Sequence, residues 1–338
     1  MDRVACLSPQ DRRDLFAETA ARMNLLPGLV EKDFWVCWTL KQLFSNPDLS
    51  PHILFKGGTT LSKVFGVIKR FSEDVDLAVD YVHLGYTGKK DPLAAKSKSQ
   101  LAKLAQEMIT TCRGYIGGDF RSSLTRQFSG LLGGDEGWSL GVDANEPDVL
   151  DFKYPRVSDA MEYLRPGVRL EIGTHAEFTP RGRYTIQPYA AEHFPLVFEV
   201  PSCEVQAITA ERTFWEKATI LHQEHHRPTE KDTPRRMSRH YYDVYMLARR
   251  PDIVDGALTD RELLARVVRH KQRFYPCAWA RYEISVPATL QLLPSSSGEA
   301  FLRRDYESMQ SMFFDRAPSF DDILEGLRAL EGKIRTMA

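Results

Sequence analysis

Apolar residues recur along the first part of the chain with two different spacings, and each spacing predicts a different kind of element. A spacing of three and four residues predicts three helices, which follow Ser8-Pro9, span Val30–Phe44 and span Thr60–Ile68. Short apolar runs bounded by polar residues predict two strands, Pro51–Phe55 and Val75–Val79. Helices and strands therefore alternate here, which favours a mixed α/β arrangement.

The middle of the chain is expected to contain more strand than helix. The polar, lysine-rich segment GYTGKKDPLAAKSKS predicts a loop over residues 85–99, and a helix follows over residues 100–115. Residues 117–200 are interpreted as strand-rich, with turns at Gly133-Gly134 and Arg165-Pro166-Gly167.

Beyond residue 205 the pattern becomes that of helices. One helix is expected from Thr209 to about His226, another from about Ser238 and a last one from about Ser319. We therefore predict an α+β fold in two parts, a mixed β-sheet domain with N-terminal helices over residues 1–204 and a C-terminal helical domain over residues 205–338.

The composition narrows the class of protein. The chain has 338 residues, of which 43% are apolar, so a substantial core is possible. Its 45 basic and 46 acidic residues nearly cancel, so a nucleic-acid partner would need a local basic surface. The candidates for such a surface are Lys89-Lys90, Lys96 with Lys98, Arg181 with Arg183, and Arg235-Arg236 with Arg239.

The cysteines and the apolar runs favour a cytoplasmic protein. The five cysteines are scattered, odd in number and form no CxxC pair, so they indicate neither a disulfide framework nor a zinc module. No apolar run reaches the length that crosses a membrane. We expect a protein of the reducing cytoplasm without a membrane partner.

Two acidic residues share one side of a predicted strand. In SEDVDLAVD, alternation directs Asp74 and Asp76 to one face, and Val75, Leu77 and Val79 to the other. Two carboxylates on one face repel each other unless a cation or full hydration compensates. Oxygen ligands at this spacing suit Mg²⁺ (or Mn²⁺), which completes its shell with phosphates and water. The alternative is a solvated strand face.

A glycine pair precedes these acids by fewer than twenty residues. Gly57 and Gly58, followed by Thr59, lie between a predicted strand and a predicted helix. Unhindered backbone amides at a helix start can face an anion. A tight turn with a threonine cap is the alternative. The combination of this turn with the acids is more specific than either alone, because it places a triphosphate beside its metal ion.

A third carboxylate would complete a two-metal site. In GVRLEIG the apolar face is formed by Val168, Leu170 and Ile172, which leaves Glu171 on the other face. Asp151, in VLDFKY, competes for the same role. We prefer Glu171.

The helical half offers a lysine and an aspartate. Lys217 falls within the apolar stripe that contains Phe214 and Leu221, and a lysine on a buried side is costly unless it meets an anion. That anion is either a structural salt-bridge partner or a ligand. Asp243 flanks the apolar stripe of the next helix, and Arg239 one turn earlier would allow an intrahelical ion pair.

These motifs together resemble a known family. The segments Gly57-Gly58-Thr59 and Arg70-Phe71-Ser72-Glu73-Asp74-Val75-Asp76 are similar to the G-G-T/S and R-x-S-x-D-x-D motifs of the AbiEii/AbiGii toxins. These nucleotidyltransferase-like proteins are the toxins of AbiE-type (type IV) toxin–antitoxin systems and include the MenT toxins. The likeness extends to EKDFWV at Glu31–Val36, to Lys217 in ERTFWEKA, to Asp243 in RHYYDVYML and to LRRDYESM in the tail.

The resemblance implies a fold and roles for single residues. It implies a nucleotidyltransferase-like sheet domain, Mg²⁺ or Mn²⁺ on the two strand aspartates, and phosphates of a nucleoside triphosphate on the glycine turn. The implied catalytic residues are Asp74, Asp76, Lys217 and Asp243; the implied nucleotide-binding residues are Gly57, Gly58, Thr59, Ser72 and Lys217. In this family Lys217 would reach phosphate, and Asp243 would orient it or help to activate the acceptor.

Two positions within the motif carry open alternatives. Ser72 occupies the family position at which phosphate on the hydroxyl can silence some members, and a plain turn serine is the alternative. Glu73 adds a third acid beside the pair, and alternation places it opposite Asp74, on the Val75 side.

The implied function is a phage-defence toxin that transfers a nucleotidyl group to an RNA acceptor, with the 3′ end of tRNA as the expected site. The expected partners are a nucleoside triphosphate, the RNA and a cognate AbiEi-type antitoxin. The alternatives are a kinase-like phosphoryl transferase that acts on protein and a regulator that binds the triphosphate without turnover.

Overall fold

The computed structural model describes residues 1–134, 137–159, 165–314 and 316–336. Its contacts divide the chain into two compact units, which are described separately. The first unit comprises residues 1–64 and 72–208, and the second comprises residues 65–71 and 209–338. A short segment that precedes the acidic pair thus belongs to the second unit. Whether the chain folds as two domains with a boundary after residue 204 stays a prediction.

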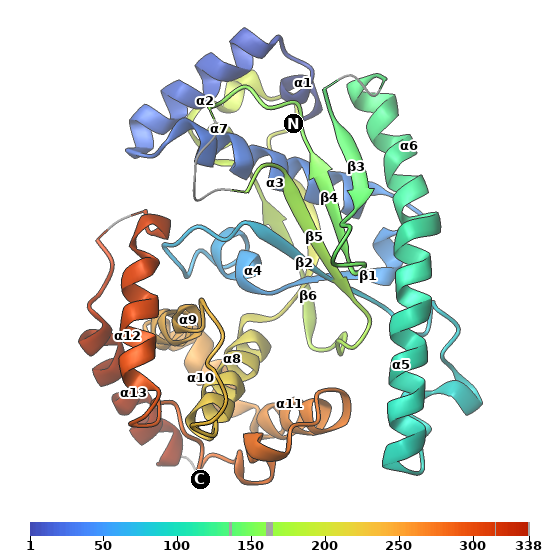
Figure 1. Cartoon of the computed structure of the whole chain (residues 1–338). Coiled ribbons are helices and arrows are strands. Elements are labelled where there is room, and N and C mark those ends of the chain that lie inside the picture. The colour runs from blue at the N-terminus through green and yellow to red at the C-terminus, as the bar shows by residue number, and fades with distance from the viewer. Residues whose placement is uncertain (135–136, 160–164, 315, 337–338) are drawn as a thin grey trace. The chain divides into compact units, whose positions relative to one another are not determined.

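The first unit is built on one seven-stranded mixed sheet (Figure 1), as the α+β prediction requires. The strand order is β3-β4-β5-β2-β1-β7-β6. β2 lies parallel to β5, β1 lies parallel to β7, and the other neighbours are antiparallel. The strands are β1 Ile53–Lys56, β2 Asp74–Val79, β3 Ser139–Val142, β4 Val149–Lys153, β5 Val168–Gly173, β6 Arg181–Ile186 and β7 Cys203–Ile208.

Seven α-helices accompany this sheet in the described residues of the first unit. They are α1 Asp2–Ala5, α2 Pro9–Met23, α3 Pro27–Ser45, α4 Gly58–Lys63, α5 Lys98–Tyr115, α6 Arg121–Leu132 and α7 Tyr189–His193. The helix expected after Ser8-Pro9 is confirmed as α2, and the Ser8 hydroxyl caps it by accepting a hydrogen bond from the backbone N–H of Asp11 at 3.1 Å. The segment expected to be one loop contains two short 3₁₀ turns, Gly88–Lys90 and Pro92–Ala94.

Two of the predicted boundaries are wrong. α4 ends at Lys63 instead of Ile68, because Gly66 has a φ of +60°, which a right-handed helix does not allow. The start of the strand-rich region is also wrong, since a π-helical turn at Ile116–Phe120 joins α5 to α6. The apolar stripe that builds this helical stretch recurs every four residues and is fully buried: Ile116, Phe120, Leu124 and Phe128.

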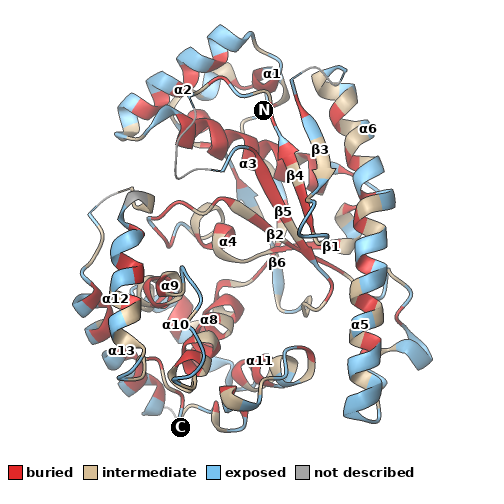
Figure 2. Ribbon diagram, in the orientation of Figure 1, coloured by how far each residue is buried: buried red, intermediate tan, exposed pale blue. Residues whose placement is uncertain are grey.

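One face of the sheet is covered by α3, which is buried along most of its length (Figure 2). Trp35 and Trp38 are completely buried and pack on Phe152 of β4, with ring centroids 5.9 and 5.7 Å away. Val75 and Leu77 of β2 belong to the same core. Because side chains alternate along a strand, this packing leaves Asp74 and Asp76 on the opposite face of the sheet.

The second unit is helical, in agreement with the prediction for the C-terminal part. Its α-helices are α8 Ala210–His225, α9 Ser238–Ala248, α10 Pro251–Thr259, α11 Arg261–Phe274, α12 Glu299–Ser308 and α13 Phe320–Arg335. Residues 65–71, the segment of the second unit that interrupts the first and is called the inserted segment below, pair with the chain between α12 and α13. The Phe71 N–H donates a hydrogen bond to the Met312 carbonyl at 2.7 Å. The Phe314 N–H donates one to the Lys69 carbonyl at 3.0 Å. Within the described parts of both units, no helix is long and apolar enough to cross a bilayer.

Candidate active site

The acidic pair lies among other charged residues on the open face of the sheet. Residues that are directly opposite each other in neighbouring strands point to the same face. Asp74 is opposite Arg169, and Asp76 is opposite Glu171 on β5 and Lys56 on β1. The structure therefore brings Asp74, Asp76 and Glu171 onto one face of three adjacent strands.

Both candidates for the third carboxylate share this face, but they differ in distance from the pair. Glu171 is on β5, the strand next to β2, whereas Asp151 is on β4, one strand further away, opposite Arg169. Burial raises the pKa of the Asp151 carboxyl, and a hydrogen bond with Asp143 raises it as well. Glu171 thus has the better position for a ligand shared with Asp76, and its role as a ligand stays a prediction.

Arg169 supplies a positive charge at the centre of the acids, and sequence reasoning did not assign it a role. Its guanidinium lies 3.8 Å from the Asp74 carboxylate, 3.7 Å from that of Glu171 and 3.1 Å from that of Glu146. Only 7% of the residue is exposed, and its Nε has no hydrogen-bond partner among the described residues. Alternation in GVRLEIG placed Arg169 on the polar face, which is the signal that could have identified it.

The charge balance around Asp74 favours an added cation. Burial raises the pKa of the Asp74 carboxyl, and the carboxylates of Glu73 and Asp76 raise it further. In the described residues, no three or more His, Cys, Asp or Glu side chains are grouped so that they could hold a metal ion. Two carboxylates nevertheless suffice for Mg²⁺ when phosphates and water supply the other ligands. The residues present therefore fit a metal ion that arrives with a triphosphate.

The glycine turn packs directly against one of the two acids. Gly57 has a φ of +84°, and a Cβ added to it would lie 1.8 Å from the Asp76 carboxylate oxygen Oδ2. Only glycine fits here, both because of the backbone conformation and because the carboxylate occupies the space of a side chain. The turn and the acid thus form one local structure. Gly58 follows as the first residue of α4.

Replacing Gly57 by Ala is expected to lower the free energy of unfolding by about 2–5 kcal/mol, the sum of an unfavourable left-handed backbone and an overpacked contact. Gly85→Ala is the matched control, because Gly85 has a φ of +86° and no atom within 4 Å of an added Cβ. That variant is expected to lose only the backbone part, about 1–2 kcal/mol. Urea denaturation measures both. Equal losses would show that Asp76 does not pack against the turn.

Thr59 connects the glycine turn to Ser72 and Asp74 through its side chain. Its hydroxyl is 2.5 Å from the Asp74 carbonyl oxygen and 3.0 Å from the Ser72 hydroxyl, and the residue is 1% exposed. A hydroxyl held in this way is committed to the chain, so any phosphate contact of Thr59 would have to come from its backbone N–H. Ser72 is half-buried at the same junction.

Three consecutive charged residues of α3 hold the segments around the site, and sequence reasoning saw them only as part of a family motif. Lys32 forms a buried ion pair with Glu73, in which the atoms are 2.7 Å apart. This pair directs Glu73 away from the face of Asp74, as alternation predicted. Asp33 forms a buried ion pair with Lys63 at the end of α4. A run of charges within an otherwise apolar helix was the available signal.

The first residue of the same triplet acts on the backbone. Both oxygens of Glu31 accept hydrogen bonds at 2.8 Å, one from the N–H of Val157 and one from that of Ser158. The three side chains of Glu31, Lys32 and Asp33 thus connect α3 to three separate segments of the first unit. A charged residue in a core is retained when its partners satisfy it.

The second unit contains a buried cluster of two cations and one anion. Lys217 of α8 donates to Asp243 Oδ2 of α9 at 2.7 Å, and Arg70 binds both oxygens of the same carboxylate at 2.9 Å. All three side chains are buried. Asp243 therefore pairs with Arg70 and Lys217 instead of the Arg239 that an intrahelical pair would use. Arg70, which lies 173 residues from Asp243, is the member that sequence reasoning missed.

The cluster favours one charge state for each member. Burial alone would raise the pKa of Asp243, but Arg70 and Lys217 lower it below the ordinary value of 3.8, so the carboxylate is ionised. Burial lowers the pKa of Lys217, and Arg70 lowers it further, against the attraction of Asp243. The lowered pKa of Asp243 favours its charged form, whereas the lowered pKa of Lys217 acts against its charged form, because the single carboxylate is shared between two cations.

The predicted site residues thus fall into two groups. The first unit brings together Gly57, Gly58, Thr59, Ser72, Asp74, Asp76 and Glu171, and the second unit brings together Lys217 and Asp243. That both groups act in one reaction stays a prediction.

Comparison with known proteins assigns this chain to a class. Residues 38–326 match the sequence profile of the family described as "Nucleotidyl transferase AbiEii toxin, Type IV TA system". The match covers most of the chain, so the protein belongs to the AbiEii family of nucleotidyltransferase toxins.

Among solved structures, the chain is similar to MenT4, a nucleotidyltransferase toxin from Mycobacterium tuberculosis H37Rv. The two sequences are 15% identical, the alignment covers 98% of this chain and 99% of the other, and the TM-score is 0.35. A comparison with curated proteins gave no match.

Proposed function

We propose that this protein transfers a nucleotidyl group from a nucleoside triphosphate to an RNA acceptor, at the 3′ end of tRNA, with pyrophosphate as the leaving group. The observation that carries the proposal is the packing of Asp76 against the Gly57 turn, on the same sheet face as Asp74. The carboxylates that would bind a metal ion and the backbone N–H groups that would bind phosphates therefore belong to one local structure.

The residues of the first unit are proposed to bind and orient the triphosphate. Asp74 and Asp76 would hold Mg²⁺ or Mn²⁺, with Glu171 as the third acid. A bound ion of this kind neutralises phosphate charge and lowers the pKa of an attacking hydroxyl. Gly57 and Gly58 would offer backbone N–H groups to the phosphates. The turn that carries them is tied by the Thr59 hydroxyl to Ser72 and to Asp74, the first residue of β2.

The residues of the second unit are proposed to stabilise the negative charge that develops during transfer. Lys217 would stabilise the negative charge that develops on the leaving group. Asp243, which is ionised and held by Arg70 on both oxygens, is proposed as a positioning residue for Lys217. It is less suited to accept a proton from the acceptor hydroxyl, because its pKa is lowered. The cognate partner is proposed to be an AbiEi-type antitoxin.

Radiolabelled triphosphates test the reaction class. The purified protein is incubated with Mg²⁺, total tRNA and each nucleoside triphosphate in turn, labelled at the α- or the γ-phosphate. We expect α-label to enter RNA. Transfer of γ-label to protein would instead identify a kinase-like enzyme, and saturable binding without transfer would identify a regulator.

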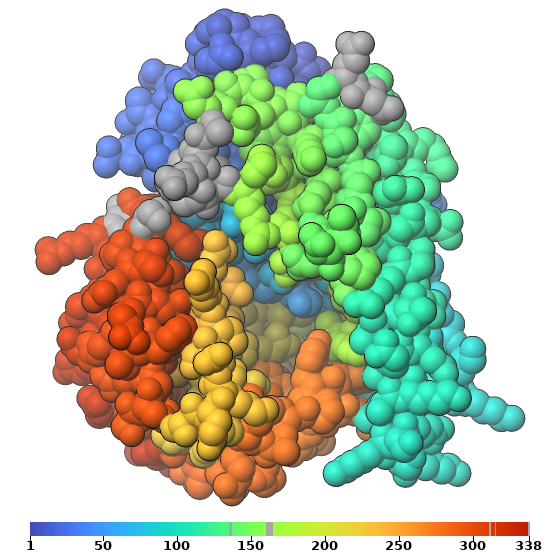
Figure 3. Space-filling view, in the orientation of Figure 1, coloured from blue at the N-terminus to red at the C-terminus, as the bar shows by residue number. Residues whose placement is uncertain are grey.

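Four lysines near the start of α5 are expected to contribute to RNA binding through their charge. Lys89, Lys90, Lys96 and Lys98 are exposed, and none forms an ion pair with a described residue. Their segment, in cyan, protrudes beside α5 (Figure 3). For single-stranded RNA, log K falls as log salt rises, and each phosphate that a protein no longer neutralises makes this negative slope shallower by about 0.7.

Changing all four lysines to Gln is therefore expected to weaken tRNA binding at low salt and to make the slope of log K against log salt less steep by about 1–3. A filter-binding titration at several salt concentrations measures it. The control changes four other exposed basic residues, Arg13, Arg22, Arg304 and Arg328, to Gln. If both variants changed the affinity for tRNA and its salt dependence equally, the lysines would contribute only to the net charge of the protein and not to an RNA-binding surface.

A further inference from the structure

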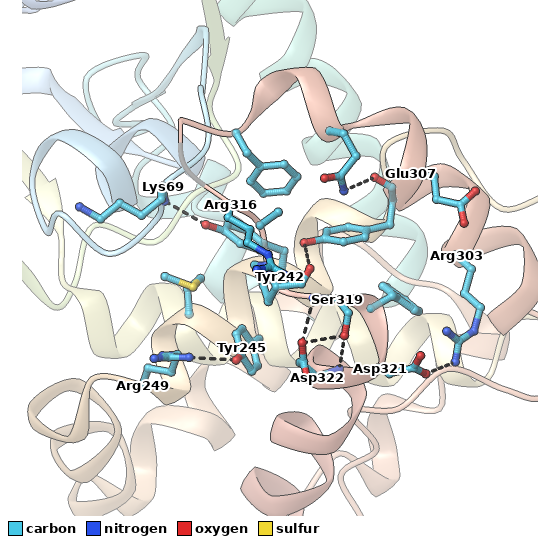
Figure 4. Close-up of a pocket in the computed structure, with 17 residues that line it drawn as sticks. Lys69, Tyr242, Tyr245, Arg249, Arg303, Glu307, Arg316, Ser319, Asp321 and Asp322 are labelled. Atoms are coloured by element: carbon cyan, nitrogen blue, oxygen red, sulfur yellow. Dashed lines mark hydrogen bonds and ion pairs between the residues drawn. The ribbon is translucent and has the colours of Figure 1, made fainter. Parts of the chain in front are cut away.

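The second unit contains a large pocket whose lining includes none of the predicted site residues. It has a volume of about 960 Å³, close to the upper end of the range for small-molecule sites. Figure 4 shows the 17 residues that line it, all of which belong to the second unit. They come from α9, α12, the start of α13, the chain before α13, and Lys69 of the inserted segment.

Aromatic rings form much of the wall. Phe313 packs edge-on against Tyr242, with ring centroids 4.9 Å apart, and against Tyr306 at 5.6 Å. Tyr242 and Tyr306 are buried, whereas Phe313 and Tyr245 are only half-buried. The pocket thus offers ring surface to a ligand in addition to the rings that complete the core.

The wall carries several basic side chains beside the acids Glu307, Asp321 and Asp322. Arg249 and Arg316 are exposed, and neither forms an ion pair with a described residue. Arg249 donates to the Tyr245 hydroxyl at 3.0 Å, and its guanidinium lies 5.7 Å from the centroid of that ring. The third arginine of the wall, Arg303, is already paired with two carboxylates, those of Glu299 and Asp321.

The frame of the pocket is held by specific contacts. Ser319 and Asp322 form a reciprocal capping box at the start of α13, which commits the Asp322 carboxylate. The Tyr306 hydroxyl donates to the Pro318 carbonyl at 2.9 Å. Tyr245 lies against Gly326 of α13, where an added Cβ would be 2.6 Å from the ring. Tyr245 therefore has a fixed position at which a ligand ring can stack.

The pocket is also connected to the buried charge cluster. Two of its residues, Lys69 and Tyr242, are the chain neighbours of Arg70 and Asp243, and the Lys69 N–H donates to the Tyr242 hydroxyl at 3.0 Å. Phe313 of the wall pairs with Arg70 through the backbone. An occupant would therefore contact residues adjacent to the cluster that holds Lys217.

We propose that this pocket binds a nucleotide unit, with the base stacked on Tyr245 or Phe313 and the phosphate paired with Arg249 and Arg316. Aromatic rings beside arginines are the combination that binds bases and phosphates without sequence preference. The unit comes either from a free mononucleotide or from a strand of RNA. An acidic peptide would use the arginines but would gain nothing from stacking.

The test measures binding to the full-length protein that carries Asp74→Asn and Asp76→Asn. Transfer is expected to be lost in this background, so a failure of the pocket and a failure of the proposed reaction are observed separately. The probes are the four nucleoside 5′-monophosphates, a fluorescein-labelled twelve-nucleotide single-stranded RNA and a fluorescein-labelled glutamate decapeptide. The pocket variants are Arg316→Gln, Arg249→Gln and Tyr245→Leu. The control is Arg328→Gln, an exposed arginine of α13 outside the pocket.

We expect each pocket variant to weaken binding of a nucleotide probe about fivefold or more, and the control to leave it unchanged. Weakened binding of monophosphates would identify a free nucleotide as the source, and weakened binding of RNA alone would identify a strand. Equal affinities in the pocket and control variants would overturn the proposal. So would a pocket-dependent affinity for the peptide without one for either nucleotide probe.

Discussion

Changing Asp74 and Asp76 together to Asn is expected to lower nucleotidyl transfer by on the order of a thousandfold or more, because several kcal/mol of metal-dependent stabilisation are lost. Asn keeps the shape of the side chains but does not repel its neighbour. Burial and the neighbouring carboxylates already raise the pKa of Asp74, so the free energy of unfolding without metal should stay equal or rise. Incorporation of α-labelled nucleotide and urea denaturation measure the two effects.

The matched control for this variant removes two charges elsewhere. Asp14→Asn with Glu18→Gln acts on exposed residues of α2 and is expected to leave transfer unchanged. If the strand variant kept its activity, or if both variants lost activity to the same extent, Asp74 and Asp76 would not be the metal ligands.

Asp243→Ala is expected to lower the free energy of unfolding by about 3–5 kcal/mol, because it leaves two buried cations without their counter-ion. Lys217→Met should cost less, about 1–3 kcal/mol, since Asp243 keeps both hydrogen bonds from Arg70. Transfer should be lost in both variants. Chemical denaturation beside an activity assay separates the two properties. A more stable Asp243→Ala protein than Lys217→Met would contradict the buried cluster.

The same cluster sets a pH dependence. Because the pKa of Asp243 is lowered on folding, its contribution to stability is present above the ordinary aspartate value of 3.8 and is lost as the pH falls towards the folded value. The stability difference between the wild type and Asp243→Asn should therefore shrink as the pH is lowered from about 5 to 2. A difference that stays constant over this range would show that Asp243 is not ionised by its partners.

Local patterns sufficed to predict the part of the site that lies in one stretch of chain. Alternation along β2 placed Asp74 and Asp76 on one face, and the same rule placed Glu73 on the other. The apolar stripes of two helices, together with the family resemblance, indicated Lys217 and Asp243, and the two side chains do contact each other. These features depend on the period of a strand or helix and on turn chemistry, which a short sequence segment carries.

Contacts between distant segments could not be predicted in this way. The pairing of Arg70 with Asp243 joins residues 173 positions apart, and that of Lys32 with Glu73 joins residues 41 positions apart. Neither sequence period nor propensity indicates which buried charge meets which. The helical stretch of residues 116–132 is a different case, because its four-residue apolar spacing was present and was outweighed by the strand-rich interpretation of the region.

Binding of Mn²⁺ tests the central claim, that two aspartates and the glycine turn form one site for a metal ion and a triphosphate, most directly. Equilibrium dialysis measures the excess of Mn²⁺ on the protein side of a membrane, with a non-hydrolysable nucleoside triphosphate on both sides, because the triphosphate also chelates Mn²⁺ in free solution. We predict at least one Mn²⁺ bound per chain in the wild type, with binding that needs the nucleotide and is lost on Asp74→Asn with Asp76→Asn. The same binding in that variant, or none in the wild type, would contradict the account.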